Sequence, residues 1–244
     1  LKKNDFHVRF SLDGLAESQN KQRPKATGGE SFEDVIRGLN YLVEKEVRFT
    51  VRTTITGHNQ NDMVSFLEAC AKWGCKDVIM VPYSAVGRGT SGVPPVAPEI
   101  FVSNYIKAYE RANELGIHFS TPADNVSRVS ARFCGADGRN FAVLPDGNIS
   151  ACSRVTKQED PFSSIFFIGN ITGSDVLINQ ERVDNLRDIN LYAFEQCKSC
   201  FAKFNCSGGC YYDRLSFDGL PNDHCNIHRN ILWFKLRLHT GSNL

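Results

Sequence analysis

The organisation of this chain follows from one stretch, Cys197-Lys198-Ser199-Cys200-Phe201-Ala202-Lys203-Phe204-Asn205-Cys206-Ser207-Gly208-Gly209-Cys210. Its four cysteines fall within fourteen residues, with two, five and three residues between them. The Gly208-Gly209 pair lets the backbone turn tightly just before the last cysteine. Disulfides would require particular pair geometries and an oxidising compartment, whereas ligation of a metal ion or cluster requires only that several thiolates converge on one point. The spacing therefore favours ligation.

Three further cysteines complete the pattern. Cys134 and Cys152 lie upstream, and four residues separate Gly147 from Cys152. Cys225 lies downstream, so that seven of the nine cysteines occupy the last 111 positions, 134 to 244. The order is a cysteine, a glycine followed by four residues and a cysteine, a C-x2-C-x5-C-x3-C run and a last lone cysteine. In this order the chain resembles SPASM, the C-terminal auxiliary-cluster domain of radical S-adenosylmethionine (radical SAM) peptide-modifying enzymes.

The resemblance implies two auxiliary 4Fe–4S clusters. It assigns the outer cluster to Cys197, Cys200, Cys206 and Cys225, and the inner cluster to Cys134, Cys152 and Cys210. Sulfatase maturases of this family carry a further cysteine shortly before the first one, but residues 125–133 contain none. One inner iron is therefore expected to be open or bound by a non-cysteine group, such as a substrate thiolate. Ser153 stands where those enzymes carry an aspartate base, which disfavours sulfatase maturation.

Zinc is the alternative occupant of such a site. Thiolates at C-x2-C spacing are common ligands of structural zinc, which takes four of them at tetrahedral geometry. Iron–sulfur clusters use the same thiolates, with four Fe–S bonds from the protein to each cubane. The cysteine and glycine pattern as a whole favours the clusters. A brown colour and acid-labile sulfide in the protein would distinguish the two.

Composition disfavours several classes of partner. The chain has 28 basic and 27 acidic residues, so no overall field attracts nucleic acid or an anionic membrane. No apolar run approaches the roughly 20 residues that span a bilayer, and the N-terminus does not resemble a secretory signal. A hydrophobic content of 41% is enough for a globular core. We expect a cytoplasmic protein. The first residue is Leu1 rather than Met, so we also expect the sequence to start partway through a longer protein.

Strand and helix patterns alternate through the leading half. Strands are predicted at 6–12, 47–55, 77–83 and 117–120, and helices at 32–45, 63–73 and 98–115. The continuous apolar run at 77–83 predicts a strand covered on both faces. Ser31 and Asp34 are expected to form an approximate capping pair for the first helix. Strict alternation indicates parallel crossover units, in either a β/α barrel or an open parallel sheet.

The family resemblance favours a partial barrel. Residues 8–14, 51–56 and 86–89 resemble the ends of the fourth, fifth and sixth strands of a radical SAM barrel. The predicted fold class is therefore α/β: the C-terminal half of a partial (β/α)6 radical SAM barrel at 1–122, followed by a small cysteine-rich α+β SPASM domain at 123–244. By the same resemblance, the candidates for cofactor binding at the barrel mouth are Ser11, Asp13, Arg52 and Arg88. Ordinary strand-end and loop polarity explains these residues equally well.

The second half of the chain lacks the regular alternation of strands and helices. It predicts a hairpin at 141–152, an extended segment at 166–171, and helices at 179–190 and about 224–238. The hairpin is expected to place Cys152 beside Cys134. Cys70 and Cys75, on or next to a helix stripe, are interpreted as inert core thiols, and His224 and His228 as partly solvated helix residues.

The chain lacks the C-x3-C-x2-C motif that holds the catalytic cluster of radical SAM enzymes. The resemblance thus implies the C-terminal portion of a radical SAM peptide or protein maturase. In the full-length enzyme, S-adenosylmethionine and a third 4Fe–4S cluster would generate the radical, an external electron donor would reduce the clusters, and a crosslink would form on the peptide or protein substrate. Residues 1–244 alone are predicted to be inactive, and no catalytic residue is identified. The alternative is a non-catalytic module or degenerate relative that uses clusters or zinc for peptide binding.

Overall fold

The structure is a computed structural model that describes residues 1–84, 92–217 and 222–241. The chain divides into two compact units, each of which is described by itself. Unit 1 comprises Leu1–Asp124 together with Asn230–Leu244, and unit 2 comprises Asn125–Arg229. All seven cysteines of the C-terminal pattern belong to unit 2.

Unit 1 is built on a parallel sheet. The strands are β1 (Val8–Ser11), β2 (Phe49–Ile55), β3 (Asp77–Pro82) and β4 (His118–Ser120), and they lie in the order β1-β2-β3-β4. Each neighbouring pair is parallel, with Ser11 opposite Arg52 and Val78 opposite Phe119. The predicted parallel crossover units are confirmed, because sequential strands are neighbours joined by helices.

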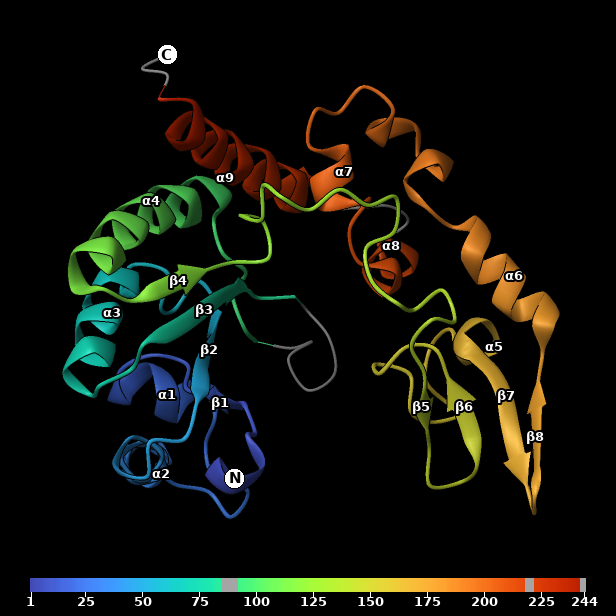
Figure 1. The fold of residues 1–244 in the computed structure, drawn as a ribbon, viewed down its shortest axis with the longest axis horizontal. Helices are drawn as coiled ribbons and strands as arrows, with labels where there is room; N and C mark the ends of the chain where they lie inside the picture. The colour runs from blue at the N-terminus through green and yellow to red at the C-terminus, as the bar shows by residue number, and fades with distance from the viewer. Residues whose placement is uncertain (85–91, 218–221, 242–244) are drawn as a thin grey trace. The chain divides into compact units, whose positions relative to one another are not determined.

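Helices α2 (Phe32–Glu44), α3 (Met63–Lys72) and α4 (Pro98–Leu115) connect these strands and lie along one side of the sheet (Figure 1). All three were predicted, and Gly116 ends α4 in the left-handed conformation, with φ of 66°. Two short helices were not predicted: the 3-10 helix η1 (Lys2–Asn4) and α1 (Ala16–Gln22). The α1 sequence is almost entirely polar and buries only Ser18 and Gln19, so it carries no apolar stripe to reveal it.

Two details of the prediction for unit 1 are wrong. Ser31 does precede α2, but its side chain makes no capping bond; its hydroxyl donates to the Arg23 carbonyl and accepts from Gln19. Asp34 pairs with Lys25 and Arg37 instead. In β3, Val78 and Met80 are fully buried whereas the alternate residues are half-buried, so the strand is not equally covered on both faces.

Unit 2 contains an antiparallel sheet. Its strands are β5 (Ala142–Val143), β6 (Asn148–Ser150), β7 (Phe167–Thr172) and β8 (Asp175–Ile178), in the order β5-β6-β7-β8. The hairpin predicted at 141–152 is β5 and β6, and the extended segment predicted at 166–171 is β7. Strand β8 was not predicted. The helices beside this sheet are α5 (Ser163–Phe166) and α6 (Gln180–Asp188), and the core of the unit gathers around Ile149, Phe166 and Leu186.

The cysteine-rich segment folds as short helical turns: η3 (Leu191–Ala193), η4 (Glu195–Cys197), α7 (Lys203–Cys206) and α8 (Tyr211–Ser216). The last helix, predicted at about 224–238, is α9 (Asn222–Thr240). Within unit 1, Phe234 of α9 packs edge-on against Tyr105 and Tyr109 of α4. Among the described residues, no helix is both long and apolar enough to cross a membrane.

Candidate metal centre

A tight backbone loop separates Cys206 and Cys210, the last two cysteines of the four-cysteine segment at residues 197–210. Cys206 ends α7, and the following Ser207, Gly208 and Gly209 all have positive φ angles, of 53°, 78° and 76°. Glycine adopts this left-handed conformation without steric cost. The chain then reaches Cys210, which stands directly before α8. The tight turn expected at Gly208-Gly209 is confirmed. Across it, Cys206 lies near Cys197, Cys200 and Cys225, whereas Cys210 lies near Arg154.

Three thiols, those of Cys197, Cys200 and Cys225, lie near the thiol of Cys206. Cys197 and Cys206 are buried, and Cys200 and Cys225 are half-buried. Burial, followed by the proximity of the Cys225, Cys197 and Cys200 thiols, raises the pKa of Cys206 to about 12. Burial also raises the pKa of Cys225, as do Cys197 and Cys200. Without a ligand, Cys206 and Cys225 would remain protonated at neutral pH, so their ionisation requires a strong positive partner such as a metal.

A buried cation lies beside this group. Arg214 is only 5% exposed, and its Nη2 donates to the sulfur of Cys197 over 3.3 Å. Its Nε donates to the Gly208 carbonyl, and its guanidinium lies 3.4 Å from the centre of the Phe194 ring. Within the described residues no carboxylate forms an ion pair with it. A buried charge needs a counter-charge, and thiolates or an anionic cluster would provide one here.

The other three thiols form a second group. Burial raises the pKa of Cys152, and the nearby Cys134 raises it as well. Burial raises the pKa of Cys210 to about 11. The guanidinium of Arg154 lies close enough to both Cys152 and Cys210 to interact with them, and it pairs with Asp213 over 2.5 Å. The thiols of Cys134, Cys152 and Cys210 therefore form a second group, with the positive charge of Arg154 beside two of them.

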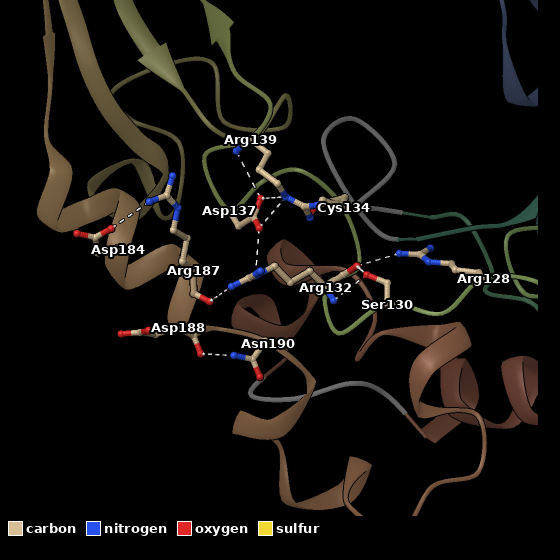
Figure 2. A network of polar contacts seen from close by, with 10 residues as sticks. All are labelled: Arg128, Ser130, Arg132, Cys134, Asp137, Arg139, Asp184, Arg187, Asp188 and Asn190. Carbon is tan, nitrogen blue, oxygen red and sulfur yellow. Dashed lines mark hydrogen bonds and ion pairs between the residues drawn. The ribbon is translucent and has the colours of Figure 1, made fainter.

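A polar network fixes the loop that carries Cys134, as Figure 2 shows. The carboxylate of Asp137 is buried and pairs with Arg139 over 2.9 Å and with Arg132 over 3.2 Å. Arg139 also donates to the carbonyl of Cys134 over 3.1 Å, and Arg132 to the carbonyl of Arg187. Sequence reasoning missed this network, because charged residues in a loop carry no periodic signal that shows which of them are buried and paired.

A third set of ligand atoms lies close together. The sulfur of Cys206 and ring nitrogens of His224 and His228 lie within 4.8 Å of one another. The interpretation of these histidines as partly solvated is wrong for His228, which is 7% exposed. It holds for His224, which is half-buried, although the Nε2 of His224 is itself buried without a hydrogen-bond partner. Burial lowers the pKa of His224 to about 4 and that of His228 to about 3. Both imidazoles are therefore neutral at pH 7.

The two groups of thiols are ligand sets of the kind that iron–sulfur clusters use. Each cubane is held mainly by cysteine thiolates, and its ligands bind different iron atoms. A four-cysteine zinc site uses the same type of ligand around a single ion.

The candidate cofactor-binding residues of unit 1, Ser11, Asp13, Arg52 and Arg88, differ in what they contact. Ser11 and Arg52 lie side by side in register on β1 and β2. Asp13 is 3% exposed; one carboxylate oxygen pairs with Arg23 over 2.6 Å and the other accepts the Thr54 N–H over 2.8 Å. Asp13 therefore ties β1 to β2 and to the α1 region. Arg88 lies outside the described residues.

The two remaining cysteines lie in the core of unit 1. Cys70 and Cys75 are 0% and 1% exposed, as expected for core thiols. Hydrogen bonding to Cys75, together with burial, raises the pKa of Cys70. A thiol in this state is a poor nucleophile and a poor metal ligand.

Comparison with solved structures gives close fold matches at low sequence identity. The structure of anSMEcpe, an anaerobic sulfatase-maturating enzyme, with bound AdoMet superposes with a TM-score of 0.71 at 19% identity, over 100% of this chain and 70% of that one. The chain has the radical SAM fold. A second anSMEcpe structure, with AdoMet and the Cp18Cys peptide, gives a TM-score of 0.70 at 16% identity, over 100% of this chain and 72% of that one.

The structure of Streptococcus suis SuiB bound to S-adenosylmethionine gives a TM-score of 0.54 at 14% identity. That match covers 87% of this chain and 51% of SuiB, so it involves about half of the SuiB chain. A scan of the sequence against protein-family models gives no match, and a comparison with curated proteins gives none either. At these identities the structural matches confirm the predicted fold class and go no further.

Proposed function

We propose that this chain is the C-terminal portion of a radical SAM peptide or protein maturase, in which unit 2 binds two auxiliary 4Fe–4S clusters. Cys197, Cys200, Cys206 and Cys225 would hold the outer cluster. Cys134, Cys152 and Cys210 would hold the inner one, with one iron left open or bound by a non-cysteine group. The clusters would take up an electron or hold the substrate while a crosslink forms.

The observation that carries this proposal is the separation of seven thiols into two groups, each beside an arginine. In the group of Cys197, Cys200, Cys206 and Cys225, the neighbouring thiols contribute to the raised pKa of Cys206 and of Cys225, and Arg214 donates to the sulfur of Cys197. The other three include Cys152 and Cys210, which share the positive charge of Arg154. All nine cysteines have free thiols, so disulfides do not account for the crowding. Donors to sulfur and nearby positive charge are the means by which proteins stabilise anionic clusters.

The proposed substrate is a peptide or a peptide segment of a protein. Structures of both fold relatives are known with peptides, Cp18Cys in anSMEcpe and the precursor peptide SuiA in SuiB. S-adenosylmethionine and a third cluster would supply the radical that abstracts hydrogen from that peptide. Residues 1–244 alone should not cleave S-adenosylmethionine, because Cys70 and Cys75 are the only cysteines outside the seven and both are buried in unit 1.

The test is an iron and sulfide count on protein reconstituted under anaerobic conditions. We expect about eight of each per chain, since two cubanes are filled. The double variant Cys197→Ser/Cys200→Ser should lose about half of both, and Cys134→Ser/Cys152→Ser should lose the other half. Cys75→Ala, which removes a thiol from unit 1, is the matched control and should retain the full count.

Two results would contradict the proposal. Protein that binds zinc stoichiometrically and contains no acid-labile sulfide would favour the non-catalytic zinc module. Equal loss of iron in both double variants, with one cluster's worth bound in the parent chain, would mean that the seven thiols serve a single site.

A further inference from the structure

We propose that Cys206, His224 and His228 form a binding site for a single divalent metal ion, of which zinc is the best-fitting, in the chain that does not yet hold the outer cluster. The three ligand atoms lie within 4.8 Å of one another. Cys206 comes from the end of α7, and the two histidines come from the first turns of α9. Residues four apart share one face of a helix, so both imidazoles can point at the same thiol.

The histidines have the chemistry that a metal site requires. The Nε2 atom of His224 is buried and has no hydrogen-bond partner. A buried polar atom without a partner costs about 1–3 kcal/mol, which a metal–nitrogen bond would remove. The two imidazole rings lie 4.2 Å apart between centres and are tilted by 35°. Because this packing already holds the two rings together, the side chains lose little conformational entropy when an ion binds.

The dimensions suit one small ion. Zn–N bonds are about 2.0–2.1 Å and Zn–S bonds about 2.3 Å, which places the ligand atoms of a tetrahedral site roughly 3.3–3.6 Å apart. Small rotations of three side chains would close the present separation of up to 4.8 Å. One sulfur and two nitrogen donors leave a fourth position for water or a neighbouring thiolate, an arrangement that zinc accepts readily.

The two kinds of occupant exclude each other through Cys206. This part of the inference rests on the proposed function, since Cys206 is also assigned to the outer cluster. An ion at Cys206, His224 and His228 would block assembly of that cluster, and a completed cluster would leave the histidines without a sulfur partner. The site itself depends only on the three side chains.

The test uses cobalt(II) as a spectroscopic stand-in for zinc, added to the reduced, metal-free chain without oxygen. One equivalent should produce the thiolate charge-transfer and tetrahedral ligand-field absorption of a site with one sulfur ligand. His228→Gln, which preserves size and polarity, and Cys206→Ala should each weaken cobalt binding at least tenfold. His239→Ala, which removes another α9 histidine, should leave the affinity unchanged. Cys225→Ser, which removes a proposed ligand of the outer cluster, should cost less affinity than either His228→Gln or Cys206→Ala, and the folding of each variant is checked by circular dichroism.

Each outcome either supports or overturns the site. Cobalt affinity that is unchanged in both folded His228→Gln and folded Cys206→Ala overturns it. So does an equal loss of affinity in Cys225→Ser, because the ion would then be held by the cysteines. In a second arm, one equivalent of zinc added before reconstitution should reduce iron uptake by about four atoms, one cubane. Cobalt binding that follows the histidines while iron uptake is unaffected by zinc would retain the site and refute only the sharing of Cys206.

Discussion

The burial of Arg214 indicates what charge its neighbours carry. A guanidinium that is 5% exposed has left water, and its contacts are a sulfur atom, a carbonyl and an aromatic ring rather than a carboxylate. Desolvating such a charge costs several kcal/mol unless a counter-charge is present. A thiolate at Cys197, held as a ligand of the proposed outer cluster, would supply that counter-charge.

Replacing Arg214 should change the electronic properties of the outer cluster. In Arg214→Met the N–H donor to Cys197 and the positive charge are both lost, so the cluster should become harder to reduce. A shift of about 60 mV or more is expected, equivalent to one charge-assisted hydrogen bond of about 1.5 kcal/mol. Redox titration followed by electron paramagnetic resonance measures it. Arg214→Lys should give a smaller shift, and Arg187→Met, on the exposed surface of α6, none; equal shifts in all three would show that Arg214 has no special role.

The sequence could predict a role for those residues whose type and spacing are by themselves typical of a metal or cluster site. The seven cysteines and Gly147 stand out by type and spacing, whereas Arg214 and His228 acquire their roles from contacts that are distant in the chain. Ser31 has the expected cap position but lacks the expected bond, because Gln19 and Arg23 compete for its hydroxyl. Local rules give a residue's options, and tertiary contacts select among them.

At the scale of elements, Gly147 explains why a glycine is placed before Cys152. It lies in the turn between β5 and β6 with φ of 85°. Its carbonyl accepts the N–H of Ile171, so the turn packs directly against β7. A β-carbon at this position would lie 2.7 Å from the carbonyl oxygen of Ile171. The turn that leads to Cys152 thus requires both a left-handed backbone and the absence of a side chain.

Gly147→Ala should therefore destabilise unit 2 by clearly more than the roughly 1–2 kcal/mol that the left-handed backbone costs an alanine. Gly173→Ala is the matched control: this glycine also turns with positive φ, of 61°, but nothing lies within 4 Å of a β-carbon there. Urea unfolding of the two variants measures the difference. Equal losses would show that the contact with Ile171 relaxes at no cost.

Elements with a strong apolar period were predicted, and polar or very short ones were not. The alternation in β2 and the stripes of α2 and α3 report a buried face directly. By contrast, α1 is polar and β8 is exposed at all four positions, so neither follows the hydrophobic pattern of its type. The short turns around the cysteines follow the loop geometry rather than any periodicity.

At the scale of the whole molecule, one buried carboxylate should make stability depend on pH. Burial raises the pKa of Asp124, although the Tyr105 hydroxyl donates to it over 2.8 Å. A folded-state pKa above the unfolded one means that the folded chain binds the proton more tightly. The contribution of Asp124 to stability is therefore largest below its ordinary pKa near 3.8 and declines as the pH rises through the raised value.

The variant Asp124→Asn keeps an acceptor for Tyr105 but cannot ionise. Relative to this variant, the parent chain should lose stability as the pH is raised from about 4 into the range where Asp124 ionises in the folded chain, by an amount on the order of a few degrees in Tm. Thermal unfolding at a series of pH values checks this. A constant difference in Tm across the series would mean that burial does not perturb Asp124.

The fold of the whole chain was predictable because two independent signals agreed. Strict alternation of strands and helices indicated parallel crossovers, and the order of the cysteines indicated a separate C-terminal domain. The surroundings of the candidate barrel-mouth residues were less predictable. Asp13, for instance, is engaged by Arg23 and Thr54, and its position at a strand end does not reveal those bonds.

Strand β8 has a consequence for the handling of this protein. Within the described chain it is the last strand of its sheet, and Val176, Leu177 and Ile178 are 60%, 58% and 48% exposed. A free edge with apolar side chains is a template for pairing with another molecule. Concentrated samples should accordingly form oligomers, which light scattering would detect. Val176→Lys should keep them monomeric, since a lysine on such a border is the safeguard that many natural sheets use against sticking to their own copies.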